Sequence, residues 1–195
     1  MNRRLFIAFT ASALLFTGIA AFAQSSTWTL DPAHSHADFQ VRHMGISNVR
    51  GSITGVAGTF TWDDKDISKS SVNVTLDANT INTNTARRDA DLKSAVFFNV
   101  AQYPTITFKS TSVTRSGGTL KVTGDLTLAG VTKSVTLDVD GPTPPQTSRN
   151  GKVVTGLSAT GLLKRSDFNF GQKSPASPAI GDEIKFTIDA EAAKQ

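Results

Sequence analysis

The sequence contains no cysteine. Disulfide bonds, thiol nucleophiles and thiolate metal sites are therefore excluded, and the folded chain must be stabilised by its core alone. Beyond residue 23 no stretch is apolar for long enough to cross a bilayer as a helix. Charge of one sign is also lacking, because 20 basic residues stand against 16 acidic ones and are scattered along the chain. We therefore expect no nucleic-acid partner.

The first 23 residues have the pattern of a secretory signal peptide. Arg3 and Arg4 precede an apolar stretch over residues 5–21, and Ala21 and Ala23 are the small residues that signal peptidase requires. A membrane anchor is the alternative, but the apolar stretch is short and interrupted by polar residues. We predict a cleaved signal over 1–23 and one mature domain over 24–195, which has 172 residues (195 minus 23).

Apolar residues alternate with polar ones along most of the mature chain, which predicts an all-β fold. The predicted inward-facing residues are Ala37, Phe39, Val41 and His43; Val72, Val74 and Leu76; Leu120, Val122, Gly124, Leu126 and Leu128; Val135, Leu137 and Val139; and Ile184, Phe186 and Ile188. Gly117-Gly118 and Ala129-Gly130 predict hairpins between antiparallel strands. The alternation stops over residues 84–95, where the composition favours a short helix. About eight strands at this spacing form a sandwich or a closed barrel.

The three histidines lie within ten residues of each other and raise the question of a metal site. In a continuous strand His34, His36 and Asp38 point to one side and form only an open strip, so we expect no metal. His43 lies on the apolar side, where a buried imidazole needs a hydrogen-bond partner. That partner is either a ligand headgroup or a neighbouring protein group. No strand-turn-helix elbow accompanies the histidines, so hydrolase chemistry has no support.

The run from Arg87 to Asp91 mixes charges of both signs on the predicted helix. Its default interpretation is a solvated helix with local charge pairs. A clamp for a phosphate or carboxylate group is the alternative, since arginine binds such groups in a bidentate manner. Asp89 is the candidate partner of Arg88 or of Arg165.

Several motifs, in order along the mature chain, resemble those of the bacterial YceI-like family, which comprises periplasmic lipocalin-like proteins that bind polyisoprenoids or similar long amphiphiles. The motifs are Trp28 to Ser35, Phe39 to Gly45, Arg87 to Phe98, Tyr103 to Ser110, Val122 to Lys133 and Lys164 to Phe168. His36 lies outside the family pattern, which weakens a metal site further. One departure concerns residue 169, where the pattern leads us to expect glycine and this chain has Asn169.

The resemblance implies a periplasmic, eight-stranded antiparallel lipocalin-like barrel, with the helical segment around 84–95 shaping one side. It also implies a non-catalytic carrier without a cofactor, which holds an isoprenoid-type lipid such as a polyprenyl chain or an isoprenoid quinone. Inward alternation and aromatic bulk independently favour several of the candidate lining residues. The candidate ligand-binding residues are Phe39, Val41, His43, Arg88, Phe97, Phe98, Phe108, Leu126 and Phe168, with His43 and Arg88 nearer the polar ends.

Other hypotheses remain open at this point. A stress-related interaction or structural module would have a barrel packed solid by its own side chains, and an esterase or metal-dependent enzyme would show turnover or a bound metal. For a carrier we expect transient membrane contact, and exposed strand edges would allow two barrels to pair as a homodimer. The sequence does not distinguish a quinone, a polyprenyl phosphate or a fatty amide as the ligand.

Overall fold

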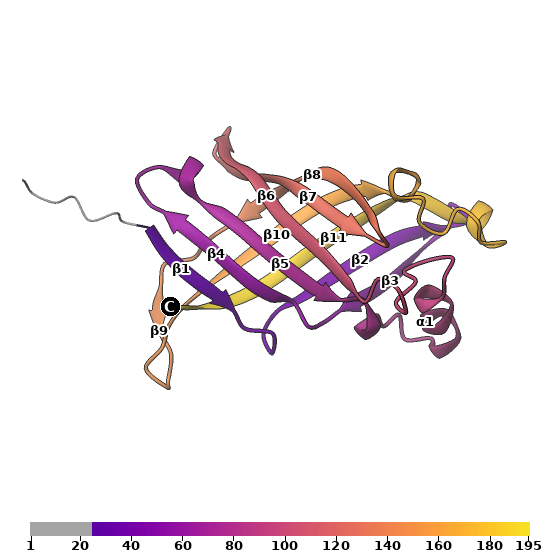
Figure 1. Cartoon of the computed structure of the whole chain (residues 1–195), viewed down its shortest axis with the longest axis horizontal. Coiled ribbons are helices and arrows are strands. Elements are labelled where there is room, and N and C mark those ends of the chain that lie inside the picture. The colour runs from indigo at the N-terminus through magenta and orange to yellow at the C-terminus, as the bar shows by residue number, and fades with distance from the viewer. Residues whose placement is uncertain (1–24) are drawn as a thin grey trace, which may run out of the picture.

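A computed structural model describes residues 25–195 of the chain. The predicted signal peptide over 1–23 lies outside these residues. The described part is a long β-barrel with one α-helix at one end (Figure 1). No helix within residues 25–195 has the length and apolar composition needed to cross a membrane.

Most of the described residues belong to strands. The strands are β1 (Ser25–Leu30), β2 (His36–His43), β3 (Ser47–Ile53), β4 (Ala57–Asp63), β5 (Ser71–Asp77), β6 (Thr105–Ser116), β7 (Thr119–Leu128), β8 (Val131–Asp140), β9 (Gln146–Thr147), β10 (Val153–Lys164) and β11 (Ile180–Lys194). The helix α1 spans Ala86–Lys93, within the range predicted from the sequence.

The sheet closes on itself because β11 pairs with β10 along one edge and with both β1 and β2 along the other. β1 and β2 therefore act as one interrupted strand, and so do β3 and β4, which pair with β2 and β1 respectively. The order then continues through β5, β6, β7, β8 and β10. With each interrupted strand counted once, the barrel has eight antiparallel strands, as predicted.

The predicted faces and hairpins are confirmed. The inward-facing residues expected on the strands line or pack against the interior, because successive side chains of a strand point to opposite sides. Gly117-Gly118 connects β6 to β7, and Ala129-Gly130 connects β7 to β8. All four turn residues have positive φ angles, between 47° and 86°. Such turns match the right-handed twist of a hairpin.

Candidate functional site

The barrel encloses a cavity of about 780 Å³. This volume falls in the range of roughly 300–1,000 Å³ that ligand pockets occupy. Deep in the barrel the lining is apolar and comes from every wall, including Val74, Phe108, Val122, Leu137 and Ile188. The structure therefore contradicts one of the sequence hypotheses, in which the barrel is packed solid by its own side chains. The space suits an elongated apolar molecule.

Eight of the nine residues predicted from the sequence to bind the ligand line this cavity. They are Phe39, Val41, His43, Arg88, Phe97, Phe98, Phe108 and Leu126. The ninth, Phe168, is buried in the core with 2% of its surface exposed, but it is not part of the lining. It belongs to a 3-10 helix (Arg165–Phe168) that follows β10, where the strand alternation used to place it has already ended.

Two glycines keep the lumen wide. Gly51 on β3 is paired with Phe39 on β2, and Gly161 on β10 is paired with Phe186 on β11. A Cβ atom added to either glycine would overlap the ring of the paired phenylalanine. Each ring therefore lies over the glycine on the neighbouring strand, against the barrel wall. A bulkier residue at either position would push the ring toward the space that a ligand needs.

Exposed lining residues mark where the cavity opens. Apart from Asp38, they belong to the end of β2, to α1 and the residues that follow it, and to the segment between β10 and β11; they are Arg42, His43, Arg87, Asp91, Val96, Pro175 and Ala176. These segments lie at the right-hand end of Figure 1. We call this end the mouth. His43 lies here and is exposed, so the expectation of a buried imidazole is wrong.

Helix α1 is attached to the mouth through Thr83. The Arg88 guanidinium donates from Nε to Thr83 Oγ1 and from Nη2 to the Thr83 carbonyl oxygen, both at 2.8 Å. The Asp89 carboxylate accepts from the Thr83 backbone N–H at 2.8 Å and from its hydroxyl. These hydrogen bonds hold the pKa of Asp89 below its usual value. The expectation that Asp89 pairs directly with Arg88 or Arg165 is wrong, because Asp89 is engaged by Thr83.

Arg165 fixes the opposite side of the mouth. It is 4% exposed and donates to the carbonyl oxygens of Phe170, Ile180 and Gly181 at 2.8–2.9 Å. Burial lowers the pKa of its guanidinium, and Asp182 opposes that effect. Under this segment the Phe170 ring packs edge-on against Phe98, with ring centroids 4.7 Å apart. The buried Arg165 side chain with its hydrogen bonds and the packed Phe170 ring therefore support this side of the mouth.

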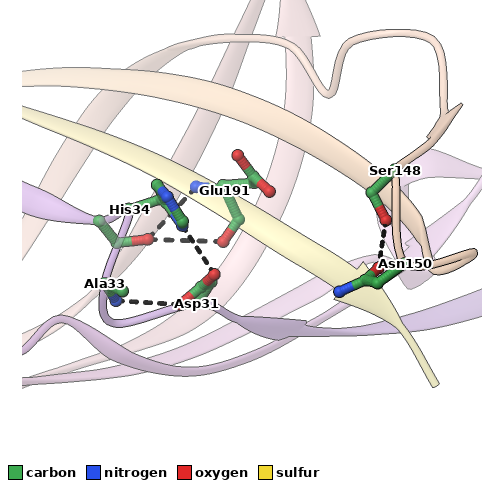
Figure 2. Close-up of polar contacts among 7 residues, drawn as sticks. Asp31, Ala33, His34, Ser148, Asn150 and Glu191 are labelled. Carbon is green, nitrogen blue, oxygen red and sulfur yellow. Dashed lines mark hydrogen bonds and ion pairs between the residues drawn. The ribbon is translucent and has the colours of Figure 1, made fainter.

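A second polar cluster lies on the outside of the barrel, at the interruption between β1 and β2 (Figure 2). His34 Nδ1 lies 2.8 Å from Asp31 Oδ2, and the Ser35 hydroxyl accepts from the Glu191 backbone N–H at 3.2 Å. Within residues 25–195, Asp31, His34 and Glu191 offer ligand atoms within 4.8 Å of one another, an arrangement that could hold a metal ion. This set differs from the strip considered in the sequence, because His36 lies instead 3.5 Å from Asp38. The hydrogen bonds fasten the strand interruption onto β11.

The chain is similar to known proteins along most of its length. A family model described as the YceI-like domain matches residues 28–192. Protein YceI of Salmonella arizonae is 40% identical over 190 residues, which cover 97% of each chain. The crystal structure of a Campylobacter jejuni YCEI protein has a TM-score of 0.67 and 30% identity, and the match covers 79% of this chain and 90% of that one.

A further solved structure is that of a polyisoprenoid binding domain from Saccharophagus degradans, implicated in plant cell wall breakdown. Its TM-score is 0.63, and the match covers 86% of this chain and 98% of that one. The sequences are 15% identical, so this likeness shows the fold alone.

The sequence interpretation did not identify Arg42, Asp91, Val96 or the residues 174–176 as part of the site. These residues come together because segments distant in the sequence meet at one barrel end. The alternation of apolar and polar residues along a strand does not predict which segments meet.

Proposed function

Because the chain belongs to the YceI-like family, we propose that it holds a long apolar lipid of the isoprenoid type inside its barrel and performs no chemistry on it. The observation that carries this proposal is the apolar cavity of about 780 Å³ running through the barrel. The similarity in fold to a domain described as polyisoprenoid-binding supports the same class of ligand.

The physical basis is the hydrophobic effect. An isoprenoid chain has no hydrogen-bonding groups, so its transfer from water into an apolar lumen gains about 0.8 kcal/mol for each buried methylene-sized group. The cavity lining supplies such a lumen from Trp62, on β4 opposite the start of β1, to Leu128 and Phe98 toward the mouth. A polar headgroup would stay at the mouth, where His43 and Arg87 are exposed.

The predicted signal peptide supports a periplasmic location for this carrier. The test is mass spectrometry of the intact protein purified from a periplasmic extract. Cleavage after Ala23 gives a chain that begins at Gln24 and has 172 residues (195 minus 23). A full-length chain recovered with the cytoplasmic fraction would contradict this location.

Lipid carriage itself is tested by extracting the purified protein with organic solvent and identifying the extract by mass spectrometry. The protein from its native host should release roughly one isoprenoid lipid per chain. A matched pair of variants adds a control: Val41→Trp places a large ring in the lumen, whereas Val153→Trp places the same ring outside the lining. We expect Val41→Trp to lose the lipid and Val153→Trp to retain it. An extract without stoichiometric lipid from wild-type protein would overturn the proposal.

A further inference from the structure

Large apolar side chains are exposed at the mouth. Met44 and Ile46, in the turn between β2 and β3, are 63% and 76% exposed, and Val96, after α1, is 41% exposed. We call residues 44–46 the hairpin tip. Single exposed apolar residues are ordinary on a protein surface, but these three belong to segments at the same barrel end (Figure 1). Three such residues at one end of the barrel indicate a surface that contacts another molecule.

The hairpin tip is held in place by the rest of the mouth. The Met44 backbone N–H donates to the Ala179 carbonyl oxygen at 2.7 Å, which joins the tip to the segment between β10 and β11. Arg42 Nη1 donates to the Ile46 carbonyl oxygen at 3.2 Å. In Figure 1 the turn between β2 and β3 lies beside this segment, at the same barrel end as α1. The apolar side chains are therefore presented by a fixed turn.

Exposed arginines lie at the same barrel end as the hairpin tip. Arg42, Arg87 and Arg88 line the mouth, and Asp91 is the carboxylate that α1 contributes to the lining. The other lining carboxylate, Asp38, lies farther back on β2 and is 3.5 Å from His36. Within residues 25–195 none of the three arginines forms a salt bridge with a carboxylate. The exposed guanidinium groups of Arg42 and Arg87 are available to an anionic surface, whereas that of Arg88 is held by Thr83.

We propose that the hairpin tip, together with Val96, docks the mouth onto a lipid bilayer that carries anionic headgroups. Met44, Ile46 and Val96 insert into the headgroup boundary, and Arg42 and Arg87 contact lipid phosphates, as apolar and basic residues do at membrane interfaces. This proposal rests on the proposed function, because a water-insoluble cargo must pass between bilayer and barrel. A second copy of the chain is a poorer occupant, since a stable interface buries about 800 Å² per partner, far more than a hairpin tip offers.

Vesicle flotation tests the proposal with the full mature chain. Vesicles of phosphatidylcholine containing phosphatidylglycerol should carry the wild-type protein with them, and vesicles of phosphatidylcholine alone should carry less. The double variant Met44→Ser/Ile46→Ser should bind the anionic vesicles on the order of tenfold more weakly. Val153→Ser is the matched control, because Val153 is 38% exposed at the opposite barrel end. Arg87→Gln should weaken binding to the anionic vesicles only.

Uptake of solanesol from detergent separates this proposal from lipid carriage. A protein that takes up solanesol from detergent but ignores vesicles overturns the docking surface and leaves carriage intact. Equal vesicle binding by the wild type and the Met44→Ser/Ile46→Ser variant overturns it as well. Loss of self-association in that variant, with a wild type that does not float, would assign the hairpin tip to a second copy of the chain and overturn bilayer docking.

Discussion

Asn169 occupies a position where the backbone turns in the left-handed sense, with φ 55° and ψ 21°. Glycine, which the family resemblance leads us to expect there, adopts such angles without steric cost. Asparagine is among the few other residues that tolerate them. The backbone N–H of Asn169 closes the 3-10 helix that carries Arg165, so its conformation supports one side of the mouth.

We predict that Asn169→Gly leaves the free energy of unfolding unchanged or raises it slightly, whereas Asn169→Val lowers it by about 1–2 kcal/mol. The reason is that a β-branched side chain clashes with the backbone at positive φ. Because the Asn169 side chain is exposed, the comparison isolates the backbone. Urea unfolding measures the difference, and equal stability of Asn169→Val and the wild type would contradict the explanation.

His34 provides a prediction about pH. Its hydrogen bond with Asp31 raises the pKa of the imidazole above the ordinary value of 6.5, and the same contact lowers the pKa of Asp31 below 3.8. The stabilisation from His34 is complete below pH 6.5 and is lost as the pH rises through its higher folded-state pKa. The stabilisation from Asp31 is complete above pH 3.8 and is lost as the pH falls through its lower folded-state pKa.

An NMR titration of the imidazole checks this prediction. Asp31→Asn should bring the pKa of His34 down toward its ordinary value, because Asp31 is the main cause of the shift. Glu191→Gln is the matched comparison and should lower the pKa less, since Glu191 acts only through its charge. A His34 pKa unchanged in Asp31→Asn would show that the contact is not maintained in solution.

The strands determine how wide the lumen is. Gly161→Ala should push the Phe186 ring inward, reduce the binding of solanesol and lower the free energy of unfolding by about 1–3 kcal/mol. Gly156→Ala on the same strand is the control, because its added Cβ would meet its nearest neighbour at 3.6 Å, an ordinary contact. Titration with solanesol and urea unfolding measure both effects. If the two variants behave alike, the glycine does not control the lumen width.

Strand alternation explains which parts of the site were predictable. Residues such as Val74 and Leu126 were placed correctly because a side chain's face depends only on its position along a strand. The exposure of His43 and the position of Phe168 outside the lining were not predicted, since both depend on where a strand ends and on the course of the chain after it. The pairing of Gly51 with Phe39 depends on the register between β2 and β3, and the sequence of one strand alone does not determine that register.

At the scale of the whole molecule, the eight antiparallel strands and the helix could be predicted because turns and alternation are local signals. The interruption that divides β1 from β2 could not, because it arises from the pairing of both segments with β11 at the far end of the chain. The metal-compatible cluster escaped prediction for the same reason: Glu191 is 157 residues from His34 (191 minus 34).

A bound lipid should stabilise the whole barrel. With free solanesol at 100 times its dissociation constant, the free energy of unfolding should rise by about 2.7 kcal/mol. For a domain of this size the midpoint of thermal unfolding should then increase by roughly 5–10 °C. Differential scanning calorimetry measures the change, with the lumen variant Val41→Trp as the control that should show no increase. An unchanged midpoint for the delipidated wild type with added solanesol would argue against binding.

The gathering of exposed lining residues at one end of the barrel gives lipid exchange a direction. A molecule with one polar and one apolar end can enter such a lumen only tail first, and it leaves headgroup first. Whenever the mouth is away from a bilayer the headgroup is in solvent, where an acceptor can recognise it before the tail has moved. The barrel would thus select a lipid by the length of its apolar chain, while the headgroup stays available for recognition by another protein.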